Sequence, residues 1–200
     1  MTDAGDVFTT LIKPNLPLFG AVAGLYAVLF LYRRFKPALR GTLREMLVVQ
    51  GTFRLLKPEG YGCFTDVRVP RPDGGGTLRV DHVVVSPHGI FVIETKPCTG
   101  AVQGAEDEAQ WVQTFATGSR VAFPNLIWQS RRHIAALAQF LKLPEAKFRP
   151  VIFLMGGGTL KPGLPEPVIN DGLTAYITGF EEVVLEPAEV ERVKAALGGK

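Results

Sequence analysis

The chain has 200 residues, of which 46% are hydrophobic and 20% are charged, and it carries a formal net charge of +3 at pH 7. This length suits one globular domain, or a smaller domain with an appendage, and the apolar content excludes a disordered chain. The two cysteines, Cys63 and Cys98, lie far apart and outside any Cys/His cluster, which argues against a disulfide framework and a structural zinc site. We therefore expect a protein of a reducing compartment.

An uncharged apolar run occupies residues 16–32 (LPLFGAVAGLYAVLFLY). Its apolar character continues around every face of a helix, which is typical of a segment that faces lipid. At about 1.5 Å per residue, the run is just long enough to cross the hydrocarbon core once. We therefore predict an N-terminal segment over 1–15 and a transmembrane helix over 16–32.

The charges around this run predict its orientation. Two acidic residues and one lysine precede it, whereas five basic residues follow it closely: Arg33, Arg34, Lys36, Arg40 and Arg44. Because positively charged flanks stay in the cytoplasm, we expect a single-pass membrane protein whose C-terminal domain is cytoplasmic. Residues 33–40 then form a basic juxtamembrane linker, which could equally bind anionic lipid.

Two other interpretations of residues 16–32 fit less well. A signal peptide carries its positive charge before the apolar run and a small-residue cleavage site after it, which is not the pattern here. A helix of a protein core has a polar face, which this run lacks. Within the run, Gly20 and Gly24 form a GxxxG pattern, which favours close approach of two membrane helices and makes a homodimer a hypothesis.

The remaining residues, 41–200, are predicted to form one α/β domain. Apolar residues at helical spacing indicate helices, and β-branched or aromatic runs bounded by Pro and Gly indicate strands. In chain order we expect a helix over 42–56 with a flaw at Gly51, strands over 63–70, 79–86 and 90–96 with a tight turn at 87–89, a helix over 129–143, strands over 151–155 and 173–178, and a closing helix over 187–197.

Three charged residues interrupt the apolar hairpin: Asp81, Glu94 and Lys96. Charged groups near a core are costly unless they are paired or bind a cation. Glu94 and Lys96 share a face, since strand side chains alternate. Asp81 joins that face only with a bulge or a one-residue offset, because pairing of Ser86 with Ile90 would turn it to the opposite face. We expect such an irregularity.

These residues have the chemistry of a metal site that cleaves phosphodiester bonds. Carboxylate oxygens of Asp81 and Glu94, with the backbone carbonyl of Thr95, are the hard ligands that Mg²⁺ prefers. Lys96 could then orient or deprotonate an attacking water and offset charge on the phosphate. The competing interpretation is that the three charged residues are strand ends that form an ordinary ion pair, since this spacing also occurs by chance.

A longer string of motifs, from about residue 41 to residue 141, is specific in its order. It contains Asp81-His82, Ser86-Pro87-His88-Gly89-Ile90, Glu94-Thr95-Lys96, Gly100, Asn125 with Gln129, and His133. In this order the motifs resemble the nuclease-related domain (NERD) of the PD-(D/E)XK nuclease superfamily. The chain departs from the usual pattern at Pro97, where an Asn usually follows the lysine, and at Leu126, where a Pro usually follows the Asn.

The resemblance implies a central mixed sheet flanked by helices. It also implies a nuclease that depends on Mg²⁺ or Mn²⁺ and acts on nucleic acid, with DNA as the expected substrate. Asp81 and Glu94 would be metal ligands with Thr95, Lys96 would be the base or electrostatic partner, and Gln129 would position water or phosphate. A glutamate of the first helix commonly joins the site in this family. Glu45, four residues after Gly41, is the match here.

A second function stays open. The same fold could serve as an inactive module that binds nucleic acid or protein at the membrane, although the presence of all three charged residues favours the enzyme. Arg131 and Arg132, on the helix predicted over 129–143, are candidate phosphate contacts. The aromatic residues Trp111, Phe115, Phe123 and Trp128 could stack on bases, but burial is the commoner fate of such side chains.

No small-molecule cofactor is expected. The glycine runs at 74–76 and 156–158 are not followed by the Lys-Ser/Thr pair of a phosphate-binding loop. The three histidines, His82, His88 and His133, are too scattered along the chain for a zinc triad.

Overall fold

A computed structural model describes residues 25–26, 30 and 47–199. Residues 47–56 are helical and lead through a short 3-10 turn, η3 (Lys57–Glu59), into the first strand. The strands are β1 (Gly62–Pro70), β2 (Thr77–Ser86), β3 (Gly89–Pro97), β4 (Ala101–Gln103), β5 (Gln110–Thr114), β6 (Arg120–Pro124), β7 (Phe148–Met155), β8 (Thr159–Leu160) and β9 (Val168–Ile169). The helices are α3 (Leu126–Leu141), α4 (Leu173–Thr178) and α5 (Pro187–Gly198), with the 3-10 turn η4 (Glu145–Lys147) before β7.

The strands form two mixed sheets. One sheet has the order β1-β2-β3-β7-β9, in which β1, β2 and β3 are an antiparallel meander and β7 and β9 add in parallel. The other has the order β6-β5-β4-β8, antiparallel except for the parallel pair β4 and β8. The predicted α/β class and the three-strand meander are therefore confirmed.

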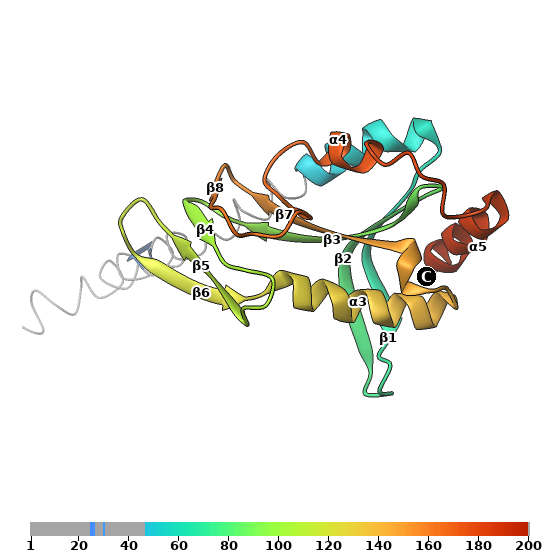
Figure 1. Ribbon diagram of the computed structural model, residues 1–200, viewed down its shortest axis with the longest axis horizontal. Helices are drawn as coiled ribbons and strands as arrows, with labels where there is room; N and C mark the ends of the chain where they lie inside the picture. Colours follow the sequence, from blue (N-terminus) through green and yellow to red (C-terminus); the bar gives the residue numbers. More distant parts are fainter. Residues whose placement is uncertain (1–24, 27–29, 31–46, 200) are drawn as a thin grey trace, which may run out of the picture. The chain divides into compact units, whose positions relative to one another are not determined.

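Helices cover both faces of the five-stranded sheet (Figure 1). On one face, α3 and α5 contribute Leu137 and Val193 to a core cluster that contains Val92 of β3. On the other face, residues 47–56 and α4 bury Phe53 and Ile177 together with the alternate residues of the same strand. A strand that is buried on both faces is apolar at nearly every position, which explains the continuous apolar run of β3.

The four-stranded sheet packs against the start of α3 and the end of β7. Trp111 of β5 is fully buried there and meets Phe123 of β6 edge to face, with 6.2 Å between ring centroids. The sequence analysis assigns no strands to residues 101–124, so this sheet is a feature that it misses. Strands of three to five residues are too short to show a clear alternation of apolar and polar side chains.

The strand predicted over 173–178 is wrong, because this segment is the helix α4. Its β-branched residues favour a strand on intrinsic propensity alone. In the fold, Leu173 and Ile177 lie one helical turn apart and are both buried against the sheet. Tertiary packing of one helical face therefore overrides the local preference.

The N-terminal predictions fall largely outside the described residues. These are the segment 1–15, the transmembrane helix 16–32, the linker 33–40 and Glu45; only residues 25, 26 and 30 of this region are described, and they are helical and exposed. No helix among residues 25–26, 30 and 47–199 combines the length and hydropathy needed to cross a membrane. The membrane anchor stays a prediction.

Gly100, in the loop between β3 and β4, offers a test of how the two sheets are joined. Its φ is +100°, and a Cβ there would lie 2.2 Å from the carbonyl oxygen of Thr114. We expect Gly100→Ala to lower the free energy of unfolding by about 3 kcal/mol or more, because backbone strain and a backbone clash add. Thermal denaturation of the full chain measures this.

The matched control for this substitution is Gly118→Ala. Gly118 also has a positive φ, +83°, but no atom lies within 4 Å of the added Cβ. It should therefore cost only the strain, about 1–2 kcal/mol. Equal losses for the two variants would show that the close approach at Gly100 has no energetic effect.

Candidate active site

Glu94 is a carboxylate buried inside the domain, 1% exposed, on β3. Gln129 Nε2 of α3 donates to its Oε2 at 2.7 Å, and His133 Nδ1 of α3 lies 2.5 Å from its Oε1. Since an ionised carboxylate can only accept, the second contact requires the ring proton on Nδ1. These hydrogen bonds offset the cost of burying the carboxylate and fix its orientation.

Asp81 lies where β2 separates from β3. The last paired residues are His82 and Ile93, so Asp81 and Glu94 are the next residues along the two strands. The Oδ2 of Asp81 accepts hydrogen bonds from the backbone N–H of Thr95 at 3.2 Å and from its Oγ1 at 3.3 Å. The Asp81 carboxylate therefore lies beside the backbone of the residue that follows Glu94.

The β2–β3 hairpin has the one-residue offset that the metal-site hypothesis requires. Ser86 pairs with Gly89 and not with Ile90. Continued one step beyond the last pair, this register sets Asp81 opposite Glu94, where residues share one face of a sheet.

A second irregularity lies on the β1 side of β2. The β1–β2 ladder omits Asp66 and Asp81, and Asp66 has a left-handed backbone with φ of 53°. Val80 and Val83 are three positions apart but belong to the same core cluster, so the alternation of side chains is broken between them. Asp81 lies within this irregular segment, between Val80 and Val83.

Lys96 contacts an aromatic ring. Its Nζ lies 4.5 Å from the centroid of the Phe123 ring on β6, within the range of a cation–π interaction. Within residues 47–199, the ion pairs do not include Asp81 or Lys96. The competing interpretation, in which Asp81, Glu94 and Lys96 are strand ends that form an ordinary ion pair, therefore does not match the described contacts, in which the partner of Glu94 is His133.

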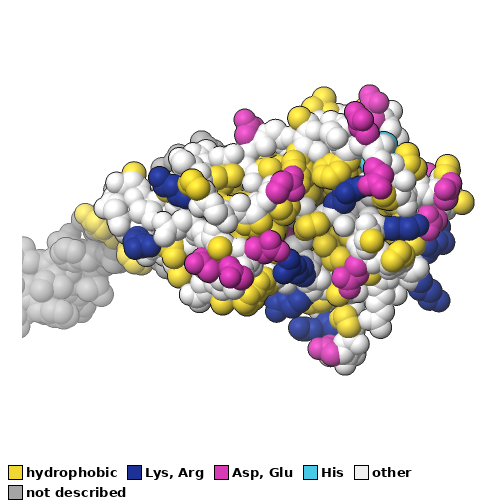
Figure 2. Space-filling view, viewed as in Figure 1, with side chains coloured by type: hydrophobic (Ala, Val, Ile, Leu, Met, Phe, Trp, Pro, Cys, Tyr) yellow, Lys and Arg dark blue, Asp and Glu magenta, His cyan; other side chains and the backbone are white. Residues whose placement is uncertain are grey.

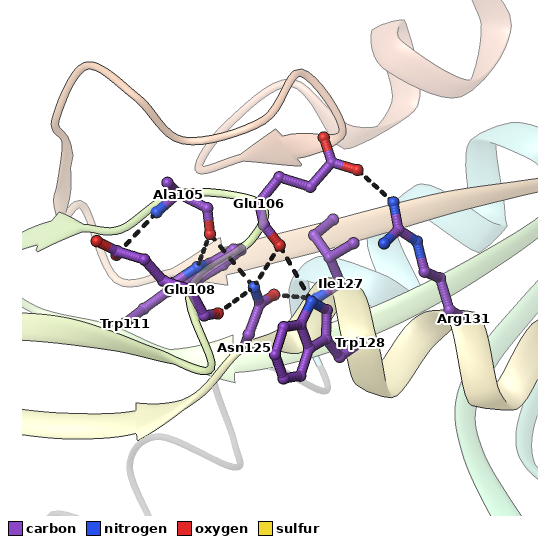
Figure 3. A network of polar contacts seen from close by, with 8 residues as sticks. All are labelled: Ala105, Glu106, Glu108, Trp111, Asn125, Ile127, Trp128 and Arg131. Carbon is purple, nitrogen blue, oxygen red and sulfur yellow. Dashed lines mark hydrogen bonds and ion pairs between the residues drawn. The ribbon is translucent and has the colours of Figure 1, made fainter.

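Asn125 joins the second sheet to the start of α3 (Figure 3). Its side chain is buried and caps the helix by accepting from the backbone N–H of Ile127 at 2.9 Å. Its Nδ2 donates to the carbonyl oxygens of Ala105, Glu106 and Glu108 at 3.3, 3.0 and 2.7 Å. The loop before β5 is thereby held against the first turn of α3, from which Gln129 projects.

Arg131 and Arg132 are both exposed on α3, as phosphate contacts would have to be. Arg131 forms an ion pair with Glu106, and the Trp128 Nε1 donates to the Glu106 carbonyl oxygen at 3.1 Å (Figure 3). Among the aromatic residues considered for base stacking, Trp111 and Phe123 are buried, whereas Trp128 is 42% exposed.

The structure thus brings Gln129 and His133 to Glu94, and Asp81 to Thr95. Shared coordination of one ion by Asp81, Glu94 and the Thr95 carbonyl stays a prediction. Across the described ranges, no group of three or more His, Cys, Asp and Glu side chains is arranged to hold a metal ion.

His133 is a candidate site residue to which the sequence assigns no role at Glu94. Its signal is the spacing of four between Gln129 and His133, which puts both on one face of a helix and lets both reach the same strand residue. In the sequence, His133 belongs to the motif string that resembles the family and is otherwise weighed as a zinc ligand, and neither observation predicts its contact with Glu94.

Neither cysteine is suited to be a nucleophile. Both are free thiols. Burial raises the pKa of Cys63 to about 11, although Lys57 opposes this, and burial also raises the pKa of Cys98. Since the thiolate is the reactive form, both side chains are unreactive near neutral pH. The carboxylates are the stronger candidates for chemistry.

Comparison with known proteins finds a matching family model and a similar protein. The family model described as NERD, nuclease-related domain, matches residues 40–155, a range that contains Asp81, Glu94, Lys96, Gln129 and His133. The chain is also 30% identical over 166 residues to a Bacillus anthracis protein described as uncharacterized, a match that covers 80% of this chain and 76% of the relative. No solved structure matches the chain significantly.

Proposed function

The chain belongs to the nuclease-related domain family, and from that premise we propose that it is a membrane-anchored, metal-dependent nuclease. It hydrolyses phosphodiester bonds, and its expected substrate is DNA. The observation that carries the proposal is the buried Glu94 carboxylate, held by two α3 side chains next to the point where β2 separates from β3 at Asp81. A carboxylate at this depth needs such fixed partners, and fixed carboxylates are what a catalytic metal site requires.

The donor atoms fit a hard divalent cation. Mg²⁺ is bound in proteins through one or two carboxylates, with waters and substrate phosphate completing the shell. Asp81 and Glu94 supply two carboxylates, and each oxygen of Glu94 accepts one hydrogen bond, which leaves lone pairs for a cation. Asp81, Glu94 and the Thr95 carbonyl would hold Mg²⁺ or Mn²⁺, which when bound would polarise the phosphodiester and acidify a water.

The other residues act on the substrate or on these carboxylates. Gln129 and His133 orient Glu94, so they are positioning residues. Lys96, placed over the Phe123 ring, would take the proton of the attacking water or neutralise charge on the phosphate. Arg131 and Arg132 would contact phosphates outside the cleavage site.

The membrane part of the proposal rests on the sequence. The uncharged run over 16–32 and the five basic residues that follow it support a single span with the nuclease domain on the cytoplasmic side. The nucleic acid reached from there would be in the cytoplasm.

Incubation of the full chain with DNA and with RNA, with EDTA, Mg²⁺ or Mn²⁺, tests the function. We expect cleavage only with a divalent cation. Absence of cleavage of every DNA and RNA substrate with either metal would reject the enzyme in favour of the inactive binding module. Flotation of the full chain with lipid vesicles, compared with a chain that lacks residues 1–36, tests the anchor separately.

Lys96→Ala should lose cleavage and should also weaken nucleic-acid binding slightly, because one positive charge leaves the phosphate path. Phe123→Leu retains the charge but removes the ring under it, so we expect a smaller fall in cleavage rate and unchanged binding. Cleavage rates and fluorescence anisotropy of a labelled oligonucleotide give the two readouts. Wild-type cleavage by Lys96→Ala would remove Lys96 from the mechanism.

A further inference from the structure

Three hollows adjoin one another along the exposed face of α3. The first is lined by residues that include Glu106, Trp128 and Arg131, and the second shares Trp128 and Arg131 with it and adds Arg132. The third, about 430 Å³ in volume, shares Arg132 with the second and reaches Arg71 beyond the end of β1. Because neighbouring hollows share lining residues, we treat the three together as one surface, the α3 groove, from the loop before β5 to the β1–β2 hairpin.

The α3 groove carries an exposed aromatic ring beside cations. Arg131 and Arg132 follow Trp128 by three and four positions, so all three lie on one face of the helix. Figure 2 shows Lys and Arg side chains gathered over α3 and toward the tip of the β1–β2 hairpin. Aromatic rings between cations in a groove are typical of surfaces that bind single-stranded nucleic acid without regard to sequence.

The same groove passes the candidate active site. Gln129 and His133, which hold the buried Glu94 carboxylate, line the third hollow together with Arg132. Arg132 therefore stands between the exposed Trp128 ring and the two residues that contact Glu94. A nucleic-acid strand that follows the groove would bring its phosphate backbone past Glu94, the carboxylate that the proposed function needs.

We propose that the α3 groove binds one strand of nucleic acid, with Trp128 stacked on an unpaired base and with Arg132 and Arg71 contacting phosphates. The inference rests on the proposed nuclease function and adds to it the form of the substrate. A base can stack on a side chain only when it is unpaired, so the groove favours a single strand over a duplex.

Three carboxylates oppose a nucleic-acid strand at the ends of the groove: Glu106 and Asp107 at one end, and Asp73 at the other. Glu106 forms an ion pair with Arg131, and Asp73 Oδ1 lies 3.7 Å from Arg71 Nε. Each of the three carboxylates repels phosphate, and Glu106 and Asp73 also compete for a cation that a phosphate would use. Neutralising Glu106 should therefore strengthen nucleic-acid binding, whereas removing an arginine of the groove should weaken it. These opposite effects on affinity test the groove.

The test measures binding of a labelled oligothymidine to the full chain, with EDTA present so that nothing is cleaved. Trp128→Ala should weaken binding ~5- to 100-fold, the range for loss of one stacked base. Arg132→Ala should weaken binding and reduce the slope of log K against log salt by ~0.7, as expected for one phosphate contact on a single strand. Glu106→Gln should tighten binding, and a duplex of equal length should compete poorly.

Tryptophan fluorescence gives an independent readout of the stacked ring. The chain has two tryptophans, and Trp111 is fully buried, so quenching by oligothymidine should come from Trp128. The quenching should disappear in Trp128→Phe, which keeps a ring for stacking and should bind more tightly than Trp128→Ala. Arg120→Ala, an exposed arginine of β6 that lines none of the three hollows, is the matched control for loss of charge.

Wild-type affinity in both Trp128→Ala and Arg132→Ala would overturn the inference, as would an equal loss in Arg120→Ala or tighter binding of the duplex. Cleavage with Mg²⁺ is measured separately on the same variants. Strand binding in the groove without any cleavage would contradict the nuclease and leave the groove intact, whereas cleavage that is insensitive to Trp128 and Arg132 would contradict the groove alone.

Discussion

Glu94→Gln is expected to reduce metal-dependent cleavage by at least ~10³-fold, because it removes a charged ligand that contributes several kcal/mol of transition-state stabilisation. It should leave binding of an oligonucleotide unchanged or tighter, since a carboxylate beside the strand repels phosphate. The measurements are single-turnover cleavage rates with Mg²⁺ and anisotropy titrations in EDTA. The combination distinguishes a lost ligand from a lost binding surface.

The same substitution also disturbs the fold, and this has to be separated from chemistry. Both oxygens of Glu94 face donors of α3, and an amide can present only one oxygen to them. A loss of stability of about 1–3 kcal/mol is therefore expected in Glu94→Gln. Asp81→Asn is the matched variant, because Asp81 is only partly buried. This variant should also lose cleavage, but with a smaller loss in the free energy of unfolding. Cleavage retained by Asp81→Asn and Glu94→Gln, both folded, would exclude these residues as ligands.

Asn125→Ala is expected to cause the largest loss of stability among single side-chain truncations outside the apolar core. The side chain is 2% exposed, caps α3 and donates to three carbonyl oxygens of the loop before β5. Loss of the cap and of the donor to these buried acceptors should cost about 2–4 kcal/mol. For a domain of this size, that lowers the melting temperature by roughly 5–15 °C.

Asn125→Asp separates the two roles of this side chain. Aspartate is as good a helix cap as asparagine, so a residue that served only as a cap would tolerate the change. Here the carboxylate would face the carbonyl oxygens of Ala105, Glu106 and Glu108, to which it cannot donate. We therefore expect Asn125→Asp to be at least as destabilising as Asn125→Ala, and near wild-type melting would contradict the role assigned to the amide.

The hairpin that carries the candidate site could be predicted from the sequence, and its details only in part. Two β-branched runs separated by a tight turn predict an antiparallel hairpin. The offset is expected because a shared metal site requires Asp81 and Glu94 on one face of the sheet. The second irregularity, with Asp66 in a left-handed conformation, arises from pairing with β1. Such long-range pairing leaves no local signal in the residues around Asp81.

The surroundings of Glu94 could be predicted least well. The family resemblance predicts Gln129 as a site residue, but it does not predict that Gln129 contacts Glu94 or that His133 accompanies it. The spacing of four on one helix gives a partial signal, while the strand residue that the helix meets depends on how α3 packs on β3. The second sheet escapes prediction because its short strands are stabilised by remote contacts of Trp111 and Asn125.

The central claim is that Asp81 and Glu94 hold one divalent cation, and Mn²⁺ binding to the full chain, measured by electron paramagnetic resonance without nucleic acid, tests it most directly. We expect one site in the wild type that is lost in Asp81→Asn and in Glu94→Gln, and no further loss when the two are combined, because the carboxylates act on the same ion. Mn²⁺ bound as tightly by either single variant as by the wild type, or no Mn²⁺ site in the wild type, would contradict the account.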